Sequence, residues 1–334
     1  MKQLAIIGAG SWGTALAIVL APRCQRVRLW VKEGDLAARM RSSRVNDVFL
    51  PGFALPGNVE ISTRFEDVLP GADVLLGVMP SKYARRVYAE MLPLVEPEMS
   101  FVSATKGLEQ GTLLRISEVV YDVIGARFTP RVAVLSGPTF ARDVAAGVPT
   151  AVVIASTDAA LARTIQHDLS GPTFRLYTNS DPVGVEVAAA LKNVIAIAAG
   201  VCHGLGLGHN AIAALITRGL AELRRLACAM GGNPHTMAGL AGLGDLVLTC
   251  TGELSRNRQV GIELARGRSP ADIVGSMTMV AEGVDTTAVA VELAARFGVD
   301  LPITAQMDLI LRGERSPRDA IRELMERTLK DEHV

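Results

Sequence analysis

A lysine and an asparagine stand in the middle of a stretch that is otherwise almost entirely apolar. Between Val183 and Val201 the long polar side chains are those of Glu186, Lys192 and Asn193. A helix that is apolar on nearly every face lies in a protein interior. Burial disfavours the charged form of a lysine and lowers its pKa. Lys192 is therefore a candidate proton donor and acceptor near neutral pH, unless its ammonium group reaches the surface along a buried stem.

The start of this stretch has the residues typical of a helix N-terminus. Asp181 is a good N-cap residue, and Pro182 is favoured at the first helical position. We therefore expect a helix over residues 183–201. Its length approaches that of a membrane span, but Glu186 and Lys192 at mid-depth favour the core of a soluble protein.

A second motif, near the N-terminus, has the spacing of a phosphate-binding loop. Residues 2–8 are typical of a short apolar strand, Gly8-Ala-Gly-Ser-Trp-Gly13 follows, and residues 14–20 are typical of a helix. In this setting Gly8 permits a tight turn, and Gly10 lets a pyrophosphate approach the backbone. Gly13 allows close packing, and the helix start offers free amides. The motif predicts dinucleotide binding, with a glycine-rich turn of an unrelated α/β fold as the alternative.

Three other loops follow apolar segments that are typical of strands. They are Met79–Lys82, Thr105–Gly107 and Leu135–Ala141. In doubly wound sheets the ligand lies outside the carboxyl ends of the strands. We therefore expect Lys106 near the crevice of the sheet, with a solvated loop lysine as the alternative.

A candidate anion site occurs late in the chain. A glycine-dense segment, Gly239–Asp245, ends in an acid, and Ser255 then precedes a helical pattern. With Ser255 as N-cap, Arg256 and Asn257 occupy the first turn. Free amides together with a guanidinium suit a monophosphate. An ordinary capped surface helix is the alternative interpretation.

The strands and helices that must position these residues occur in an order that predicts two domains. Strand-like and helix-like segments alternate up to residue 180, as in a doubly wound sheet. The remainder is helical. We expect strands over 26–31, 73–79, 100–104, 131–135 and 151–155, helices including 83–92 and 113–124, and later helices over 183–201, 210–230, 256–266, 283–297, 302–311 and 317–329. We thus predict a nucleotide-binding domain over 1–180 and a helical domain over 181–334, with the substrate between them.

Composition narrows the class of protein. The 334 residues are 49% hydrophobic and 20% charged, with zero net charge, which is typical of a soluble protein and gives no sign of nucleic-acid binding. Four cysteines lack metal or disulfide spacing and are interpreted as buried thiols in a reducing cytosol. The five histidines also lack metal-ligand spacing, so we expect no metal. We see no signal peptide and expect a cytoplasmic protein without membrane insertion.

Together the motifs resemble those of the bacterial-type NAD(P)-dependent sn-glycerol-3-phosphate dehydrogenases. The similarity extends from Gly8 to about Thr287. The matching motifs are Gly-Ala-Gly-Ser-Trp-Gly-Thr (8–14), Ala-Thr-Lys-Gly-Leu (104–108), Leu-Ser-Gly-Pro-Thr-Phe-Ala (135–141), Ala-Leu-Lys-Asn-Val-Ile-Ala-Ile-Ala-Ala-Gly (190–200), Gly-Leu-Ala-Gly-Leu-Gly-Asp (239–245), Leu-Ser-Arg-Asn-Arg (254–258) and Val-Ala-Glu-Gly (280–283). This resemblance implies an α/β Rossmann-like N-terminal domain with a doubly wound sheet, plus an all-α C-terminal domain like that of 6-phosphogluconate dehydrogenase.

The resemblance also implies roles for the matching residues. The catalytic group would comprise Lys192 as proton donor and acceptor, Lys106 and Asp245. Cofactor contacts would come from Gly8, Gly10, Ser11, Trp12, Gly13, Lys32, Lys106, Ala141, Arg256, Val280 and Glu282. Substrate contacts would come from Lys106, Gly137, Thr139, Lys192, Asp245, Ser255, Arg256 and Asn257. Three positions depart from the family pattern: Thr139 replaces the usual serine, His209 stands where an acid is common, and the 44–53 loop matches poorly.

The implied reaction is reduction of dihydroxyacetone phosphate to sn-glycerol 3-phosphate, supplying glycerophospholipid synthesis. NADPH and NADH are both expected cofactors. Lys32, after the second strand, favours the 2′-phosphate of NADPH, whereas the adjacent Glu33 suits the 2′-hydroxyl of NADH. The expected partner is this small-molecule substrate, with a homodimer as a candidate assembly. The alternatives are another two-domain reductase, such as a β-hydroxyacid dehydrogenase or ketopantoate reductase, and a non-catalytic NAD(P)-sensing protein.

Overall fold

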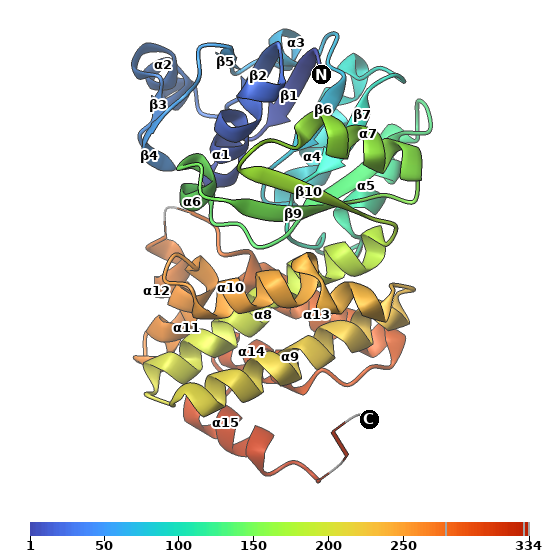
Figure 1. Cartoon of the computed structure of the whole chain (residues 1–334). Helices are drawn as coiled ribbons and strands as arrows, with labels where there is room; N and C mark the ends of the chain where they lie inside the picture. The colour runs from blue at the N-terminus through green and yellow to red at the C-terminus, as the bar shows by residue number, and fades with distance from the viewer. Residues whose placement is uncertain (278, 330, 333–334) are drawn as a thin grey trace.

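The N-terminal half of the chain forms one eight-stranded sheet. The computed structural model describes residues 1–277, 279–329 and 331–332. Figure 1 shows the sheet and its helices above a separate layer made only of helices. The strands of the sheet are β1 (Gln3–Ile7), β2 (Arg26–Trp30), β5 (Val59–Ser62), β6 (Val74–Gly77), β7 (Ser100–Ser103), β8 (Arg131–Ser136), β9 (Thr150–Ala155) and β10 (Phe174–Asn179). A small antiparallel hairpin joins β3 (Val45–Asn46) to β4 (Leu50–Ala54).

The strand order is β10-β9-β8-β7-β6-β1-β2-β5. The six strands from β5 to β8 are parallel, whereas β9 is antiparallel to β8 and β10 is parallel to β9. The predicted doubly wound sheet is therefore confirmed, with a reversed pair of strands at one edge. The edge strands β5 and β10 were not predicted, because half or more of the residues in each are at least partly exposed and give a weak apolar signal.

Helices cover both faces of the sheet, which explains its continuous apolar strands. Along β1, Leu4 and Ile6 pack in one core cluster, while Ala5 and Ile7 pack in another on the opposite face. The helices of this half are α1 (Ser11–Leu20), α2 (Gly34–Ser43), α3 (Phe65–Val68), α4 (Ala84–Met91), α5 (Ile116–Ile124), α6 (Ala141–Ala145) and α7 (Ala159–Leu169). The predicted start of α5 at 113 was too early, because Leu113 has a positive φ of 63° and belongs to the preceding turn.

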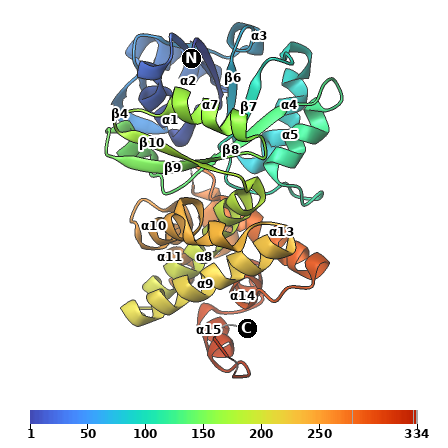
Figure 2. The same ribbon diagram turned by 45° about the vertical axis from the view of Figure 1, so that its right-hand side comes forward.

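In the part of the chain that the structure describes, the C-terminal half contains helices joined by turns and no strand after β10. Its α-helices are α8 (Pro182–Gly204), α9 (His209–Ala229), α10 (Asp245–Thr251), α11 (Arg256–Ala265), α12 (Pro270–Gly275), α13 (Glu282–Phe297), α14 (Pro302–Leu311) and α15 (Pro317–Met325). Helix α15 ends four residues earlier than predicted. Figure 2 shows α15 at the end of the molecule farthest from the sheet. Because β10 ends at Asn179 and α8 begins at Pro182, residue 180 remains our proposed domain boundary.

Helix α8 is the core of this half, packed among α9, α10, α11 and α13. Asp181 caps it as predicted, with its side chain accepting a bond from the Gly184 amide. Gly200 permits a close crossing with α11, since a Cβ there would lie 1.9 Å from the Arg258 carbonyl oxygen. Helix α8 is long and apolar enough to cross a membrane, but that window is entirely buried within the protein, so packing explains its composition.

Candidate active site

The loop after β1 has a backbone shaped by its glycines. Gly8 has a φ of 114°, and a Cβ atom there would lie 2.4 Å from the Val78 carbonyl oxygen. A Cβ at Gly13 would lie 1.9 Å from the Gly8 carbonyl oxygen, so helix α1 packs against the turn only because Gly13 has no side chain. At Gly10, by contrast, no heavy atom lies within 4 Å of the Cβ position. The backbone there is open to a ligand, as the motif predicts.

The start of α1 also keeps hydrogen-bond donors available. Gly10 is its N-cap and offers no side-chain acceptor, so the amides of the first turn lack a capping partner. The indole nitrogen of Trp12 is buried without a hydrogen-bond partner. Both features fit a loop that receives a dinucleotide pyrophosphate. Ser11 lies at the first position of the same helix.

The hairpin after α2 supports this loop through a residue that was not singled out from the sequence. Asn46 is fully buried, and its Nδ2 donates to the Ala9 carbonyl at 2.8 Å and to Thr14 Oγ1 at 2.8 Å. Asn46 thereby holds the glycine loop to the β3–β4 hairpin. Nothing in the sequence indicated this role, because Asn46 lies in a poorly matched loop and its partner Ala9 is 37 residues away in the chain.

Two lysines from different halves of the protein meet at one buried aspartate. Lys106 follows β7 at the carboxyl edge of the sheet, and its Nζ lies 2.7 Å from Asp245 Oδ2. Lys192 Nζ lies 3.1 Å from Asp245 Oδ1. Lys106 Nζ also donates to the Gly137 carbonyl at 2.9 Å and to Thr139 Oγ1 at 3.0 Å. The predicted catalytic group is therefore assembled in space from β7, β8, α8 and α10.

The ammonium group of Lys192 does not reach the surface. The residue is only 5% exposed. Burial lowers the pKa of Lys192 to about 8, with a further lowering by the charge of Lys106 and a partial opposing effect from Asp245. A lysine with this pKa exchanges a proton near neutral pH, as expected for a general acid.

Thr249, rather than Asn193, orients Lys192. Lys192 Nζ donates to Thr249 Oγ1 at 2.8 Å, and Thr249 Oγ1 lies 2.6 Å from the Asp245 carbonyl oxygen. The next residue of α8, Asn193, has other partners, because helix geometry turns neighbouring side chains about 100° apart. Its Nδ2 donates to the Lys106 carbonyl at 3.3 Å, and its Oδ1 accepts from Asn257 at 2.9 Å.

The expected anion site at the start of α11 has the predicted cap. Ser255 Oγ accepts a bond from the Arg258 amide. Arg256 is exposed in the first turn, and its Nη1 donates to the Val280 carbonyl at 2.8 Å. Asn257 differs from the expectation for its side chain. Both ends of its amide are used internally, since Oδ1 accepts from the Gly283 amide and Nδ2 donates to Asn193. The backbone of Asn257 remains part of the helix start.

The other predicted cofactor residues line the same edge of the sheet. Ala141 is the first residue of α6. Lys32 is exposed beyond β2, with its Nζ 5.2 Å from the centre of the Tyr83 ring. Glu282 begins α13, and its carboxylate accepts bonds from the Ser81 amide at 3.1 Å and the Ser81 hydroxyl at 2.6 Å. Glu282 thus joins the helical half to the loop after β6.

Some residues lie away from this site. His209 is exposed at the start of α9. Cys228 is exposed on the same helix, so the expectation of four buried thiols was wrong for this cysteine, while Cys24, Cys202 and Cys250 are buried. Among the described residues, no three His, Cys, Asp or Glu side chains are grouped to hold a metal ion.

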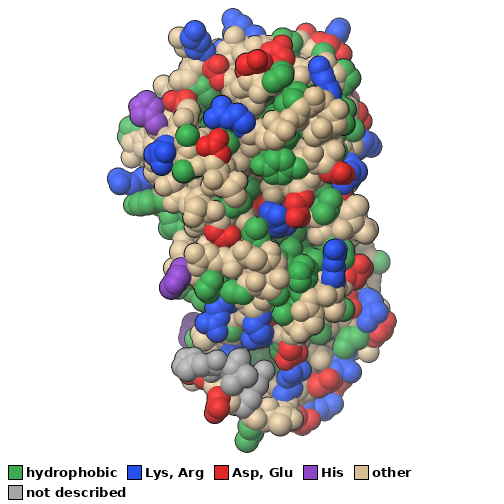
Figure 3. Space-filling model, turned by 90° about the vertical axis from the view of Figure 1, so that its right-hand side faces the viewer, with side chains coloured by type: hydrophobic (Ala, Val, Ile, Leu, Met, Phe, Trp, Pro, Cys, Tyr) green, Lys and Arg blue, Asp and Glu red, His purple; other side chains and the backbone are tan. Residues whose placement is uncertain are grey.

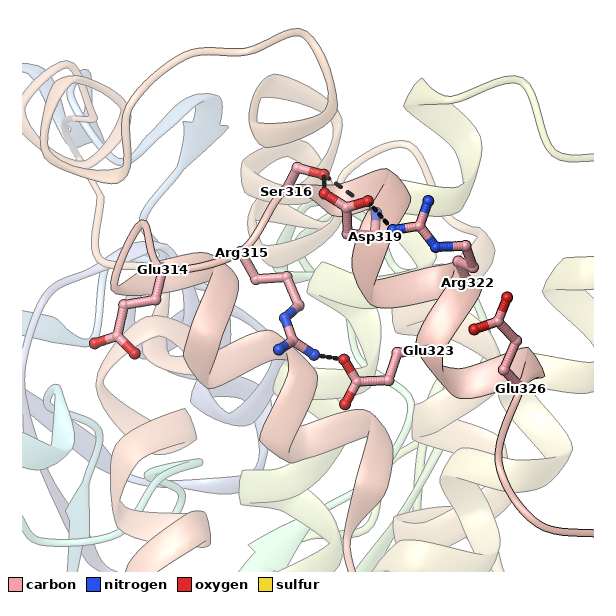
Figure 4. A pocket seen from close by; sticks show the side chains of 7 residues that line it. All are labelled: Glu314, Arg315, Ser316, Asp319, Arg322, Glu323 and Glu326. Atoms are coloured by element: carbon pink, nitrogen blue, oxygen red, sulfur yellow. Dashed lines mark hydrogen bonds and ion pairs between the residues drawn. The ribbon is translucent and has the colours of Figure 1, made fainter.

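A surface hollow of about 390 Å³ lies over α15, far along the chain from the lysines. Figure 4 shows two pairs among its charged side chains, Arg315 with Glu323 and Arg322 with Asp319. These pairs leave the hollow without a converging set of free groups. Figure 3 shows acidic and basic side chains interspersed over one face of the molecule.

The fold and the site define an NAD(P)-dependent dehydrogenase with a nucleotide-binding half and a helical half. Family models match both halves: NAD-dependent glycerol-3-phosphate dehydrogenase N-terminus over residues 3–162, and NAD-dependent glycerol-3-phosphate dehydrogenase C-terminus over residues 181–322. The chain belongs to the NAD-dependent glycerol-3-phosphate dehydrogenase family.

Individual relatives are similar to this chain over nearly its full length. A glycerol-3-phosphate dehydrogenase [NAD(P)+] of Koribacter versatilis is 58% identical over 329 residues, covering 98% of each chain. One of Geobacter metallireducens is 51% identical over 331 residues, covering 99% of each chain. The crystal structure of glycerol-3-phosphate dehydrogenase from Coxiella burnetii is similar with a TM-score of 0.93 and 41% identity, covering 97% of this chain and 99% of that one.

Proposed function

We propose that this protein reduces dihydroxyacetone phosphate to sn-glycerol 3-phosphate, and that Lys192 provides the proton. The observation that supports this most directly is the Lys106–Asp245–Lys192 cluster, in which a lysine that follows β7 and a lysine of α8 share one buried carboxylate. It combines a buried lysine, whose pKa is lowered to about 8, with a second cation on the same carboxylate. A carbonyl placed between two such ammonium groups is polarised and can be protonated.

The proposed chemistry divides between cofactor and protein. A bound nicotinamide supplies the hydride that is added to C2 of the substrate. Lys192 donates a hydrogen bond to the carbonyl oxygen, stabilises the negative charge that develops there, and transfers its proton to that oxygen. Asp245 and Thr249 hold the ammonium group in place for this transfer. Lys106 keeps Asp245 paired after Lys192 has become neutral.

The phosphate of the substrate is proposed to bind at the start of α11. Arg256 uses one donor on the Val280 carbonyl, and a guanidinium has five. The first-turn amides and the helix dipole favour an anion there. Binding energy at the phosphate would hold the carbonyl against Lys192, which raises the rate of the chemical step rather than only the affinity.

NADPH is proposed as the modestly preferred cofactor, with NADH accepted. Three cations surround the exposed ring of Tyr83, which lies in the segment after β6: Lys32 at 5.2 Å, Lys82 at 5.5 Å and Arg86 at 5.6 Å from its centre. Such a group attracts the 2′-phosphate of NADPH. Glu33 is adjacent and exposed and opposes this preference.

The decisive experiment is a coupled comparison of binding and turnover. Purified protein is mixed with NADPH and either dihydroxyacetone phosphate or free dihydroxyacetone, and the loss of nicotinamide absorbance is followed. We expect turnover with the phosphorylated substrate and very little with the other. Cofactor binding without turnover would instead support a sensor. A role in supplying glycerophospholipid synthesis, a cytoplasmic location and a homodimeric assembly also remain proposals.

A further inference from the structure

A second buried ionic contact joins the two halves, and the proposed chemistry makes no use of it. Glu186 lies in α8, six residues before Lys192, and is 3% exposed. Its carboxylate accepts three bonds from the sheet-bearing half. The donors are the Ser117 amide at 2.8 Å, the Ser117 hydroxyl at 2.5 Å and Arg115 Nη1 at 2.7 Å.

The partners of Glu186 belong to the segment that also carries Lys106. This segment leaves β7, forms a bridge between Leu108 and Arg115, and leads into α5. The Glu109 amide donates to the Leu114 carbonyl at 2.9 Å, which closes the loop on itself. Lys106 therefore lies at one end of a closed loop and Arg115 at the other.

Helix α8 contacts both ends of this loop. At one end Glu186 holds Arg115 and Ser117, and at the other Asn193 donates to the Lys106 carbonyl at 3.3 Å. Lys192 precedes Asn193 directly, so the position of α8 along the loop sets where Lys192 lies relative to Lys106. From α8, a single 3.3 Å bond reaches the backbone of Lys106, whereas three short bonds connect Glu186 to the other end. The side chain of Lys106 is held separately, by Asp245 of α10 at 2.7 Å.

We propose that Glu186, acting through Arg115 and Ser117, is a positioning residue that sets the placement of Lys192 relative to Lys106 across the two halves. This inference rests on the proposed function of the two lysines. A buried ion pair is by itself weak support for stability, because the cost of removing both charges from water offsets their attraction. Directional bonds to one carboxylate do, however, fix the register of a helix against a loop.

The proposal predicts a change in titration as well as in rate. Three charged or titratable groups of the described chain act on Lys192. Asp245 and Cys250 raise the pKa of Lys192, whereas Lys106 lowers it. Asp245 lies on α10 in the helical half and stays with Lys192 if α8 moves. Lys106 lies on the loop, so a shift of α8 and α10 would stretch its pair with Asp245 and move its charge away from Lys192. A shift of α8 away from the loop therefore raises the pKa of Lys192.

Glu222 provides a matched control for Glu186. It is a glutamate buried to 1% exposure that accepts the Ile303 amide at 2.6 Å, the Thr304 amide at 3.1 Å and the Thr304 hydroxyl at 2.8 Å. All of these partners lie in the helical half, at the start of α14. Substitution of Glu222 by glutamine thus removes a comparable buried carboxylate without touching the contact between the halves.

The experiment compares Glu186→Gln with Glu222→Gln in the full-length protein. Both should lower Tm. We expect only Glu186→Gln to lower kcat for dihydroxyacetone phosphate, by about 10- to 100-fold as for a small misplacement of reacting groups, with a smaller change in KM. We also expect the alkaline fall of kcat to move to higher pH in Glu186→Gln alone.

A milder variant covers the case in which Glu186→Gln does not fold. Ser117→Ala removes the hydroxyl bond to Glu186 and keeps the amide bond and Arg115. It should lower kcat less and move the pH profile in the same direction. The proposal is overturned if the Glu186 or Ser117 variant keeps the wild-type kcat and pH profile, or if Glu222→Gln reproduces both changes. Wild-type protein without any turnover would instead overturn the proposed function.

Discussion

The two carboxylate oxygens of Asp245 pair with two different lysines: Oδ1 lies 3.1 Å from Lys192 Nζ, and Oδ2 lies 2.7 Å from the Nζ of Lys106, which belongs to the opposite half of the protein. The carboxylate is 1% exposed, so the attraction is weakly screened by water. This relationship brings a proton donor to the edge of the sheet and keeps it charged despite burial. Its consequences can be measured through rate, pH dependence and binding.

Replacement of Lys192 by methionine should lower kcat for dihydroxyacetone phosphate by about 10²–10⁴-fold, which is the usual contribution of a positioned general acid. Methionine fills similar space in the apolar core. NADPH titration should give nearly the same Kd as the wild type, since the ammonium group of Lys192 bonds to Thr249 and Asp245 of the helical half. Retained turnover would show that Lys192 is structural.

The pH dependence should follow the lowered pKa of Lys192. Reduction requires the protonated amine, so kcat for reduction should fall as pH rises through about 8. Oxidation of glycerol 3-phosphate requires the neutral amine and should rise over the same range. Stopped-flow measurement of the chemical step in both directions checks this, and a flat profile between pH 7 and 9 would contradict it.

Replacement of Asp245 by asparagine should move that pH profile downward. Asp245 raises the pKa of Lys192, and its removal leaves the charge of Lys106 unopposed. We therefore expect the alkaline fall of kcat at lower pH than in the wild type, together with a lower Tm because two lysines lose their shared partner. An unchanged or raised midpoint in the kcat profile would show that Asp245 does not control this titration.

Replacement of Arg256 by alanine should raise KM for dihydroxyacetone phosphate. A hydrogen bond to a charged group contributes about 1.5–3 kcal/mol, or roughly 10- to 150-fold. Arg266→Ala is the control, because Arg266 lies just beyond the other end of α11 and pairs with Glu263. Similar KM values for the Arg256 and Arg266 variants would place the phosphate elsewhere, with Lys106 as the next candidate.

Replacement of Lys32 by aspartate should lower kcat/KM for NADPH while that for NADH holds. The substitution puts a negative charge where the 2′-phosphate is expected and leaves the ribose hydroxyl of NADH unaffected. The NADH rate of the same variant serves as the internal control. An unchanged ratio of the two efficiencies would remove Lys32 from the cofactor site and direct attention to Lys82 and Arg86.

The sequence by itself determined the local features of this protein. Glycine spacing between a strand and a helix predicted the turn at Gly8, because a positive φ there excludes most side chains. Apolar residues on nearly every face predicted that α8 is internal, but left open whether the ammonium group of Lys192 is buried or reaches the surface; the structure shows that it is buried. The caps at Asp181 and Ser255 were also predicted, since each depends on residues within three or four positions.

Only the tertiary structure decided which of these residues meet. Lys106 and Asp245 are 139 residues apart in the chain, and their contact depends on how the helical half packs on the edge of the sheet. The same packing placed Thr249 rather than Asn193 on Lys192, joined Glu186 to Arg115, and brought Asn46 to the glycine loop. Periodicity and spacing describe one element at a time, whereas these contacts arise from the relative position of several elements.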